Sequence, residues 1–256
     1  MSKIDKEKYI QSCNPLFSLG VAHRGLYNNE KGITENSIEA FKNAIAHQVA
    51  FEFDIHLTKD NQLAVIHDSD LKRLTGKDGI VEDLTLKELK ENYTLLNGAK
   101  IPSFEEVLAL GHDDFPMVIE LKVYRKNYRP LTKRFLQAMK GVKNKENYNI
   151  ISFDPRALFP LKKLGILRQL LVCQGHFWVF KLRYFFEAID IENTLLDNPR
   201  VKSYYRNHFV NAWTIENKDV FDRILPECDT ITYQFLDPAY VKEQLKEKNK
   251  KYLQEK

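Results

Sequence analysis

The chain has 256 residues, 43% of them hydrophobic, which suits one large domain with a substantial buried core. Its formal net charge of +4, from 39 Lys and Arg against 35 Asp and Glu, is too small to demand a nucleic acid or another polyanion as partner. Three widely separated cysteines, Cys13, Cys173 and Cys228, indicate neither a disulfide framework nor a cysteine-based zinc centre.

The apolar runs of the chain argue against secretion and membrane insertion. Residues 1–9 alternate Lys with Asp and Glu, and no apolar stretch of signal-peptide length follows them, so we expect a cytoplasmic protein. The longest apolar runs, such as Leu170–Cys173, are strand-sized and far shorter than the roughly 20 residues of a membrane span. We therefore expect no stable membrane insertion.

Short apolar segments rich in β-forming residues alternate with helix-like segments, an order typical of βα units around a parallel sheet. Strands are predicted at Leu19–His23, Ala50–His56, Leu63–His67, Val118–Lys122, Ile150–Phe153, Leu170–Cys173, Val210–Trp213 and Thr230–Tyr233. Helices are predicted at Asn36–His47, Phe104–Leu110, Pro130–Lys140, Pro155–Leu164, Pro199–Tyr205, Asn217–Leu225 and Pro238–Lys248. The pattern predicts an α/β fold, a closed (β/α)₈ TIM barrel that forms a single domain over residues 1–256.

One stretch departs from the alternation. Between His67 and Ile101, a glycine-containing turn and an isolated helix at Thr85–Asn92 stand where a βα unit is expected. We predict a small insertion after the third strand, at about residues 68–100, on the active-site side of the barrel.

Two acidic residues alternate with apolar ones in the second strand. Strand alternation sends Glu52 and Asp54 to one face, and the apolar face of a barrel strand packs against the helices. The two carboxylates then face the barrel interior, where they repel each other unless a cation lies between them. Glu120 is a third acid near the end of an apolar strand. A lone acid of this kind is more often part of a buried ion pair, but three predict a site for a hard divalent cation such as Mg²⁺, Ca²⁺ or Mn²⁺.

Two histidines close predicted barrel strands. His23 and His67 are expected at the carboxyl-terminal mouth, where catalytic groups of such barrels lie. Because histidine titrates near neutrality, the pair can supply a general base and a general acid, although either alone would more often be structural. The other five histidines are left unassigned.

Cationic and polar residues flank these acids and histidines. The charges of Arg24 and Lys122 suit the oxygens of a phosphodiester, and the alternative is a salt bridge to the carboxylates. Gly25 permits a backbone conformation that brings the loop close to a ligand. Glu35 and Asn36 open a helix and are predicted to orient the site as well.

At this point the sequence closely resembles the glycerophosphodiester phosphodiesterase family. The motifs that carry the resemblance are His23-Arg24-Gly25, Glu35-Asn36-Ser37, Glu52-Phe53-Asp54, His67-Asp68 and Glu120-Leu121-Lys122. Further similarity lies in Ile101–Val107, Ser152–Phe153 and Val210–Thr214. The family pattern fails in the last strand, Cys228–Gln234, which lacks the common Asp or Asn followed by Tyr-Pro.

The resemblance implies a metal-dependent barrel enzyme that hydrolyses a small-molecule glycerophosphodiester to glycerol 3-phosphate and an alcohol. It implies the roles of metal ligand for Glu52, Asp54 and Glu120, acid/base pair for His23 and His67, and phosphate contact for Arg24 and Lys122. It alone implies that Trp213 lines the substrate cleft. The alternatives are a lysophospholipase D-like lipid phosphodiesterase and a barrel that binds phosphodiesters without catalysis.

The segment His176–Phe186 is unusually aromatic and matches no motif of the family. We expect it to pack within the helix layer of the barrel. Contact with a lipid surface or with an apolar substrate is the alternative, and substrate preference would then lie in this segment.

Overall fold

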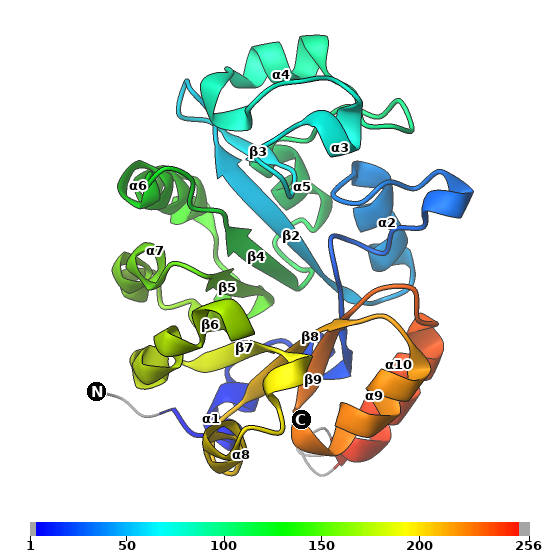
Figure 1. Ribbon diagram of the computed structural model, residues 1–256, viewed down its shortest axis with the longest axis vertical. Coiled ribbons are helices and arrows are strands. Elements are labelled where there is room, and N and C mark those ends of the chain that lie inside the picture. Colours follow the sequence, from blue (N-terminus) through cyan, green and yellow to red (C-terminus); the bar gives the residue numbers. More distant parts are fainter. Residues whose placement is uncertain (1–3, 251–256) are drawn as a thin grey trace.

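The computed structural model describes residues 4–250, and its strands form a closed barrel (Figure 1). Eight strands pair in parallel in the order β1-β9-β8-β7-β6-β5-β4-β2, and the pairing of β1 with β2 closes the ring. Their bounds are Val21–Ala22 (β1), Ala50–Leu57 (β2), Met117–Leu121 (β4), Tyr148–Ser152 (β5), Leu167–Val172 (β6), Ala188–Glu192 (β7), Val210–Ile215 (β8) and Thr230–Tyr233 (β9). The predicted (β/α)₈ barrel is confirmed.

One predicted strand is wrongly placed, and one barrel strand was not predicted. The predicted third strand exists as β3, Leu63–Val65, but it pairs antiparallel with β2 and is no part of the ring. The eighth barrel strand is β7, which the sequence analysis missed. Its segment carries Asp190 between two isoleucines and follows the aromatic run directly, so no uninterrupted apolar stretch marks it.

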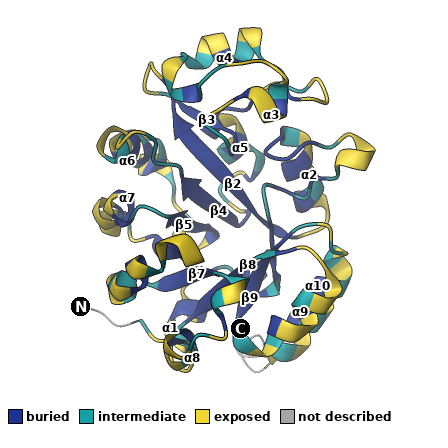
Figure 2. Ribbon diagram, in the orientation of Figure 1, coloured by how far each residue is buried: buried dark blue, intermediate teal, exposed yellow. Residues whose placement is uncertain are grey.

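The helices surround the ring, with exposed outer faces and buried strands (Figure 2). Their bounds are Lys6–Gln11 (α1), Ile38–Ala46 (α2), Lys72–Thr75 (α3), Leu86–Asn92 (α4), Phe104–Leu110 (α5), Tyr128–Ala138 (α6), Pro155–Leu158 (α7), Pro199–Tyr205 (α8), Lys218–Ile224 (α9) and Pro238–Lys248 (α10). Proline opens α7, α8 and α10 behind a capping Asp or Asn, as the sequence indicates. The predicted helix Pro155–Leu164 is instead divided into α7 and a 3₁₀ segment, η6 (Phe159–Leu164), because Pro160 has no N–H for a helical hydrogen bond.

The aromatic segment forms η7, a 3₁₀ segment at Gln174–Phe185 between β6 and β7. Part of it packs in the outer layer as predicted, since Val179 and Phe180 are buried. Trp178, however, is 61% exposed.

The amino-terminal segment closes the end of the barrel opposite to the strands' carboxyl ends. Tyr9 and Phe17, from α1 and the 3₁₀ segment Pro15–Leu19, share an apolar cluster with Val21, Ala50 and Ala188 at the strand beginnings. This end is therefore filled with apolar side chains, and the polar interior lies toward the strands' carboxyl ends.

The segment between β3 and α5 has a small apolar core of its own, which includes Leu71, Val81 and Leu89. Figure 1 shows α3 and α4 beyond the end of β2, outside the ring. Within residues 4–250, no helix has the length and apolar character needed to cross a bilayer.

Candidate active site and metal centre

Three buried carboxylates meet inside the barrel. Asp54 on β2 lies directly opposite Glu120 on the neighbouring strand β4, and Glu52 precedes Asp54 on the same face of β2. One carboxylate oxygen from each residue lies within 4.8 Å of the other two, and the residues are only 2%, 1% and 8% exposed in the order Glu52, Asp54 and Glu120. The structure thus brings together the three predicted metal ligands.

Burial and neighbouring charges shift the pKa values of the three acids in different directions. Burial and the neighbouring carboxylates raise the pKa of Glu52 well above its ordinary value. Burial, opposed by Lys122, raises the pKa of Glu120 to about 7. For Asp54, the cations Lys122 and Arg24 together with His67 outweigh burial and lower the pKa. The raised pKa values of Glu52 and Glu120 show that the nearby cations do not fully stabilise three ionised carboxylates, and a divalent cation would do so.

Lys122 and Arg24 contact the acidic cluster from two sides. The Nζ atom of Lys122 lies 3.1 Å from Oε1 of Glu120 and 3.4 Å from Oδ1 of Asp54. The Nε atom of Arg24 lies 3.8 Å from Oδ2 of Asp54. Both cations thus make the salt bridges that were the alternative to phosphate binding, while their side chains stay 17% and 16% exposed.

Asn36 and Glu35 make direct hydrogen bonds to Asp54 and Arg24. Asn36 donates from Nδ2 to Oδ2 of Asp54 at 2.9 Å, and its own Oδ1 accepts from the Asp54 backbone N–H at 3.3 Å. Glu35 accepts from Nη1 of Arg24 at 2.7 Å. Asn36 and Arg24 both have a left-handed backbone, with φ of +54°, which aims these side chains from the loop before α2 into the mouth.

His67 is held by a chain of charged side chains. Its Nδ1 atom lies 2.6 Å from Oδ1 of Asp68, and the other oxygen of Asp68 accepts from Nε of Arg73. Arg73 also donates from both Nη atoms to Glu35. Burial, with Lys122 as an added cation, lowers the pKa of His67.

His23 is held by an amide. Its Nδ1 atom lies 2.7 Å from Oε1 of Gln234, which also accepts from the Tyr27 hydroxyl at 2.7 Å. The Nε2 atom of Gln234 donates to Glu216 at 2.5 Å. Burial, with the positive charge of Arg24, lowers the pKa of His23 to about 4, so the ring is neutral at physiological pH.

Several of these contacts involve residues without a predicted role. Asp68 belongs to the His67-Asp68 motif, and Arg73 and Gln234 lie outside the predicted site. Gln234 directly follows the last strand, where the family pattern fails, and that departure was the available signal. His56, left unassigned, is buried and contacts Glu82 and the backbone carbonyl of His67, so it supports the His67 loop.

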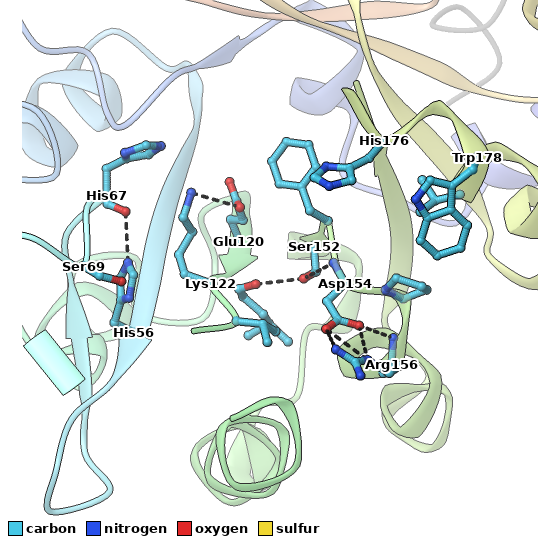
Figure 3. A pocket seen from close by; sticks show the side chains of 15 residues that line it. His56, His67, Ser69, Glu120, Lys122, Ser152, Asp154, Arg156, His176 and Trp178 are labelled. Atoms are coloured by element: carbon cyan, nitrogen blue, oxygen red, sulfur yellow. Dashed lines mark hydrogen bonds and ion pairs between the residues drawn. The ribbon is translucent and has the colours of Figure 1, made fainter. Parts of the chain in front are cut away.

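Two cavities adjoin the acidic cluster and share part of their lining. The smaller, of about 100 Å³, is lined by His23, Arg24, Glu52, Trp213 and Asp190 among others. The larger, of about 680 Å³, extends from Lys122 toward η7. Figure 3 shows the lining of the larger cavity, and His67, Glu120 and Phe153 line both cavities. Trp213, whose ring meets that of Phe153 edge-on at 5.6 Å, therefore does line a cleft at the site.

The chain is similar to known proteins in sequence and in fold. The model of the Glycerophosphoryl diester phosphodiesterase family matches residues 23–226. A glycerophosphodiester phosphodiesterase of Caldanaerobacter subterraneus subsp. tengcongensis is 31% identical over 81% of this chain and 90% of its own length. The human lysophospholipase D is 28% identical over 62% of this chain and 54% of its own. A crystal structure of a glycerophosphodiester phosphodiesterase from Parabacteroides distasonis, 26% identical, superposes with a TM-score of 0.73 over 89% of this chain and 96% of that one. The chain therefore belongs to the glycerophosphoryl diester phosphodiesterase family and is an enzyme of phosphodiester hydrolysis.

Proposed function

We propose that this enzyme hydrolyses glycerophosphodiesters to glycerol 3-phosphate and an alcohol, with a divalent metal ion held by Glu52, Asp54 and Glu120. The observation that carries the proposal is the meeting of three buried carboxylate oxygens within 4.8 Å, beside two histidines that line the same cavity. An all-oxygen set suits Mg²⁺, Ca²⁺ or Mn²⁺. When bound, such an ion polarises a phosphoryl oxygen and offsets the charge that develops on it.

Arg24 and Lys122 bind the phosphoryl group in this proposal. Both contact the acids, yet both keep an exposed part of their side chain at the mouth, so each can hold a carboxylate and a phosphoryl oxygen together. Asn36 and Glu35 keep Asp54 and Arg24 in place for this contact.

His23 and His67 move protons in the proposed reaction. Each ring is engaged at Nδ1, which leaves Nε2 to exchange a proton with the substrate. His23, held neutral beside Arg24, suits the general base that deprotonates the nucleophile, which is water or the 2-hydroxyl of the substrate's glycerol. His67 is assigned the general acid for the leaving alcohol, because the carboxylate of Asp68 at Nδ1 stabilises a proton on the ring and offsets part of the lowering of its pKa by burial.

Leaving-group chemistry tests the two roles. Alanine at either histidine should lower kcat at least roughly a hundredfold on an alkyl ester. With a 4-nitrophenyl ester, whose leaving group needs no acid, His67→Ala should recover most of its rate, and His23→Ala should not. Equal recovery of both variants would reject the assignment, and near wild-type rates of both on the alkyl ester would reject catalysis by these histidines.

A lysophospholipase D-like activity at the same site is the second candidate, and the human relative of that name favours it. The discriminating experiment compares the release of choline from glycerophosphocholine and from lysophosphatidylcholine. The non-catalytic barrel is no longer proposed, because the chain belongs to an enzyme family.

A further inference from the structure

We propose that the larger cavity is the subsite for the second alcohol of the diester, and that it selects an alcohol with a large apolar body, such as a long alkyl chain. This inference rests on the proposed function, since it names the substrate class of the same site. It gives a role to η7, whose aromatic sequence matches no family motif.

The first argument is the arrangement of the two cavities. A phosphodiester carries two substituents on its phosphorus, and Glu120 and His67 line both a cavity of about 100 Å³ and one of about 680 Å³. The smaller contains His23, Arg24 and Asp190, polar groups that suit the hydroxyls of glycerol. The second alcohol then enters the larger cavity, past His67, the proposed acid for its departure.

The second argument is the chemistry of the cavity wall. Its apolar residues are Leu121, Val123, Phe153, Pro155, Trp178 and Val179. The charged side chains that line it already have partners, since Glu120 pairs with Lys122 and Asp154 pairs with Arg156. The wall therefore offers little to an ammonium head group and much to an apolar body.

The third argument is the position of Trp178. Figure 3 places Trp178 and His176 across the cavity from His67 and His56. The neighbouring Val179 is buried, whereas Trp178 lines the cavity and is 61% exposed. An exposed indole loses unfavourable contact with water when an apolar ligand covers it.

A chain-length series tests the subsite. The substrates are the ethyl, butyl and octyl esters of glycerol 3-phosphate, with the choline ester as the charged comparison, all assayed with the metal-loaded enzyme. We expect kcat/KM to rise at least tenfold from the ethyl to the octyl ester and the choline ester to resemble the ethyl ester. In Trp178→Ala the octyl-to-ethyl ratio should fall at least fivefold.

Phe185→Ala is the matched control, because Phe185 is an exposed aromatic residue of the same segment that does not line either cavity. Phe185→Ala should keep the wild-type octyl-to-ethyl ratio of kcat/KM. Val123→Phe fills the cavity instead of removing part of its wall, and it should lower this ratio as Trp178→Ala does.

A flat series, a preference for the choline ester, or equal effects of Trp178→Ala and Phe185→Ala would overturn the subsite. If wild-type enzyme turned over none of the esters, the proposed function would fail instead. Calorimetric binding of the octyl and ethyl esters would then still test the cavity, and equal affinities would reject it.

Discussion

The Nδ1 atom of His23 lies 2.7 Å from the Oε1 atom of Gln234. The orientation of this amide is fixed from its other end, because its Nε2 atom faces the carboxylate of Glu216, which only accepts. The amide oxygen therefore faces His23, and Nδ1 must carry the proton. This contact leaves Nε2 of the neutral ring free to accept one.

Gln234→Ala should therefore lower kcat roughly tenfold to a hundredfold with a small change in KM, because the ring loses its fixed tautomer. Gln234→Glu should keep an acceptor and add a negative charge, which raises the pKa of His23 and moves the acidic limb of the kcat profile to higher pH. Tyr27→Phe is the control, since it removes a second donor to the same oxygen and leaves the His23 contact intact. A wild-type pH profile in both Gln234 variants would refute the positioning role.

The carboxylate of Asp68 beside His67 should also affect kcat. Asp68→Asn leaves the size of the side chain unchanged but weakens the support of a protonated ring, so kcat should fall roughly tenfold to a hundredfold. The matched control is Asp70→Asn two residues later, an exposed residue whose Oδ1 accepts from the Lys72 backbone N–H. Equal rates in the two variants, measured with an alkyl ester, would show that Asp68 does not act through His67.

The acidic cluster predicts that metal stabilises the wild type and that loss of one carboxylate removes this effect. A divalent cation at about a hundred times its Kd should add about 2.7 kcal/mol to the free energy of unfolding, or roughly 5–10 °C in Tm. Glu52→Gln keeps an acceptor for the Arg24 backbone N–H but removes one of the repelling charges. Without metal it should be at least as stable as the wild type, and with metal it should gain little.

Differential scanning calorimetry with EDTA, Mg²⁺, Ca²⁺ and Mn²⁺ measures this effect without an activity assay. Glu39→Gln, at an exposed acid, should respond to metal as the wild type does. An equal rise in Tm for Glu52→Gln would place the metal elsewhere.

The acidic cluster was predictable because strand alternation is a local property of the sequence. Glu52 and Asp54 alternate with large apolar residues, and the pairing of β2 with β4 then brings Glu120 beside them. The barrel strand β7 was not predictable in the same way, because buried Asp190 interrupts its apolar pattern. Asn211 on β8 donates a hydrogen bond to the carboxyl group of Asp190. This contact joins two strands, so the sequence of one segment cannot predict it.

The ion pairs beside His67 could not be predicted from local sequence patterns either. Arg73 reaches Glu35 and Asp68 from α3, and the contact with Glu35 spans 38 residues of sequence. Strand periodicity says nothing about such loops, whose geometry depends on how the segment after β3 folds on its own apolar core.

The ion pairs of buried Glu35 predict that the free energy of unfolding depends on pH. Burial raises its pKa, but the hydrogen bonds and charges of Arg73 and Arg24 outweigh burial and lower it overall. A lowered folded-state pKa contributes stability that is present above the unfolded-state value and is lost as the pH falls through the folded-state value. Glu35→Gln should cost about 1–3 kcal/mol at pH 7, and the difference from wild type should shrink toward about pH 3.

Urea unfolding at both pH values measures this difference. Glu105→Gln breaks an exposed pair with Arg134 and should cost no more than about 0.5 kcal/mol at either pH. A Glu35→Gln penalty that stays constant down to about pH 3 would contradict an ionic origin.

Gly25 links the helix layer to the site, and its replacement should damage both. Its φ is +81°, and a Cβ atom there would lie 2.8 Å from Cβ of Ala40 and 3.0 Å from the Phe41 ring on α2. Gly25→Ala should therefore cost about 2–4 kcal/mol, whereas Gly32→Ala, with φ of +71° and open space, should cost about 1 kcal/mol from the backbone alone. Because the Gly25 N–H also donates to the backbone carbonyl of Glu52, any shift that relieves the clash displaces the mouth of the metal centre. Tm and kcat should then both fall in Gly25→Ala. A variant with wild-type kcat and Tm would show that the loop before α2 does not hold the site.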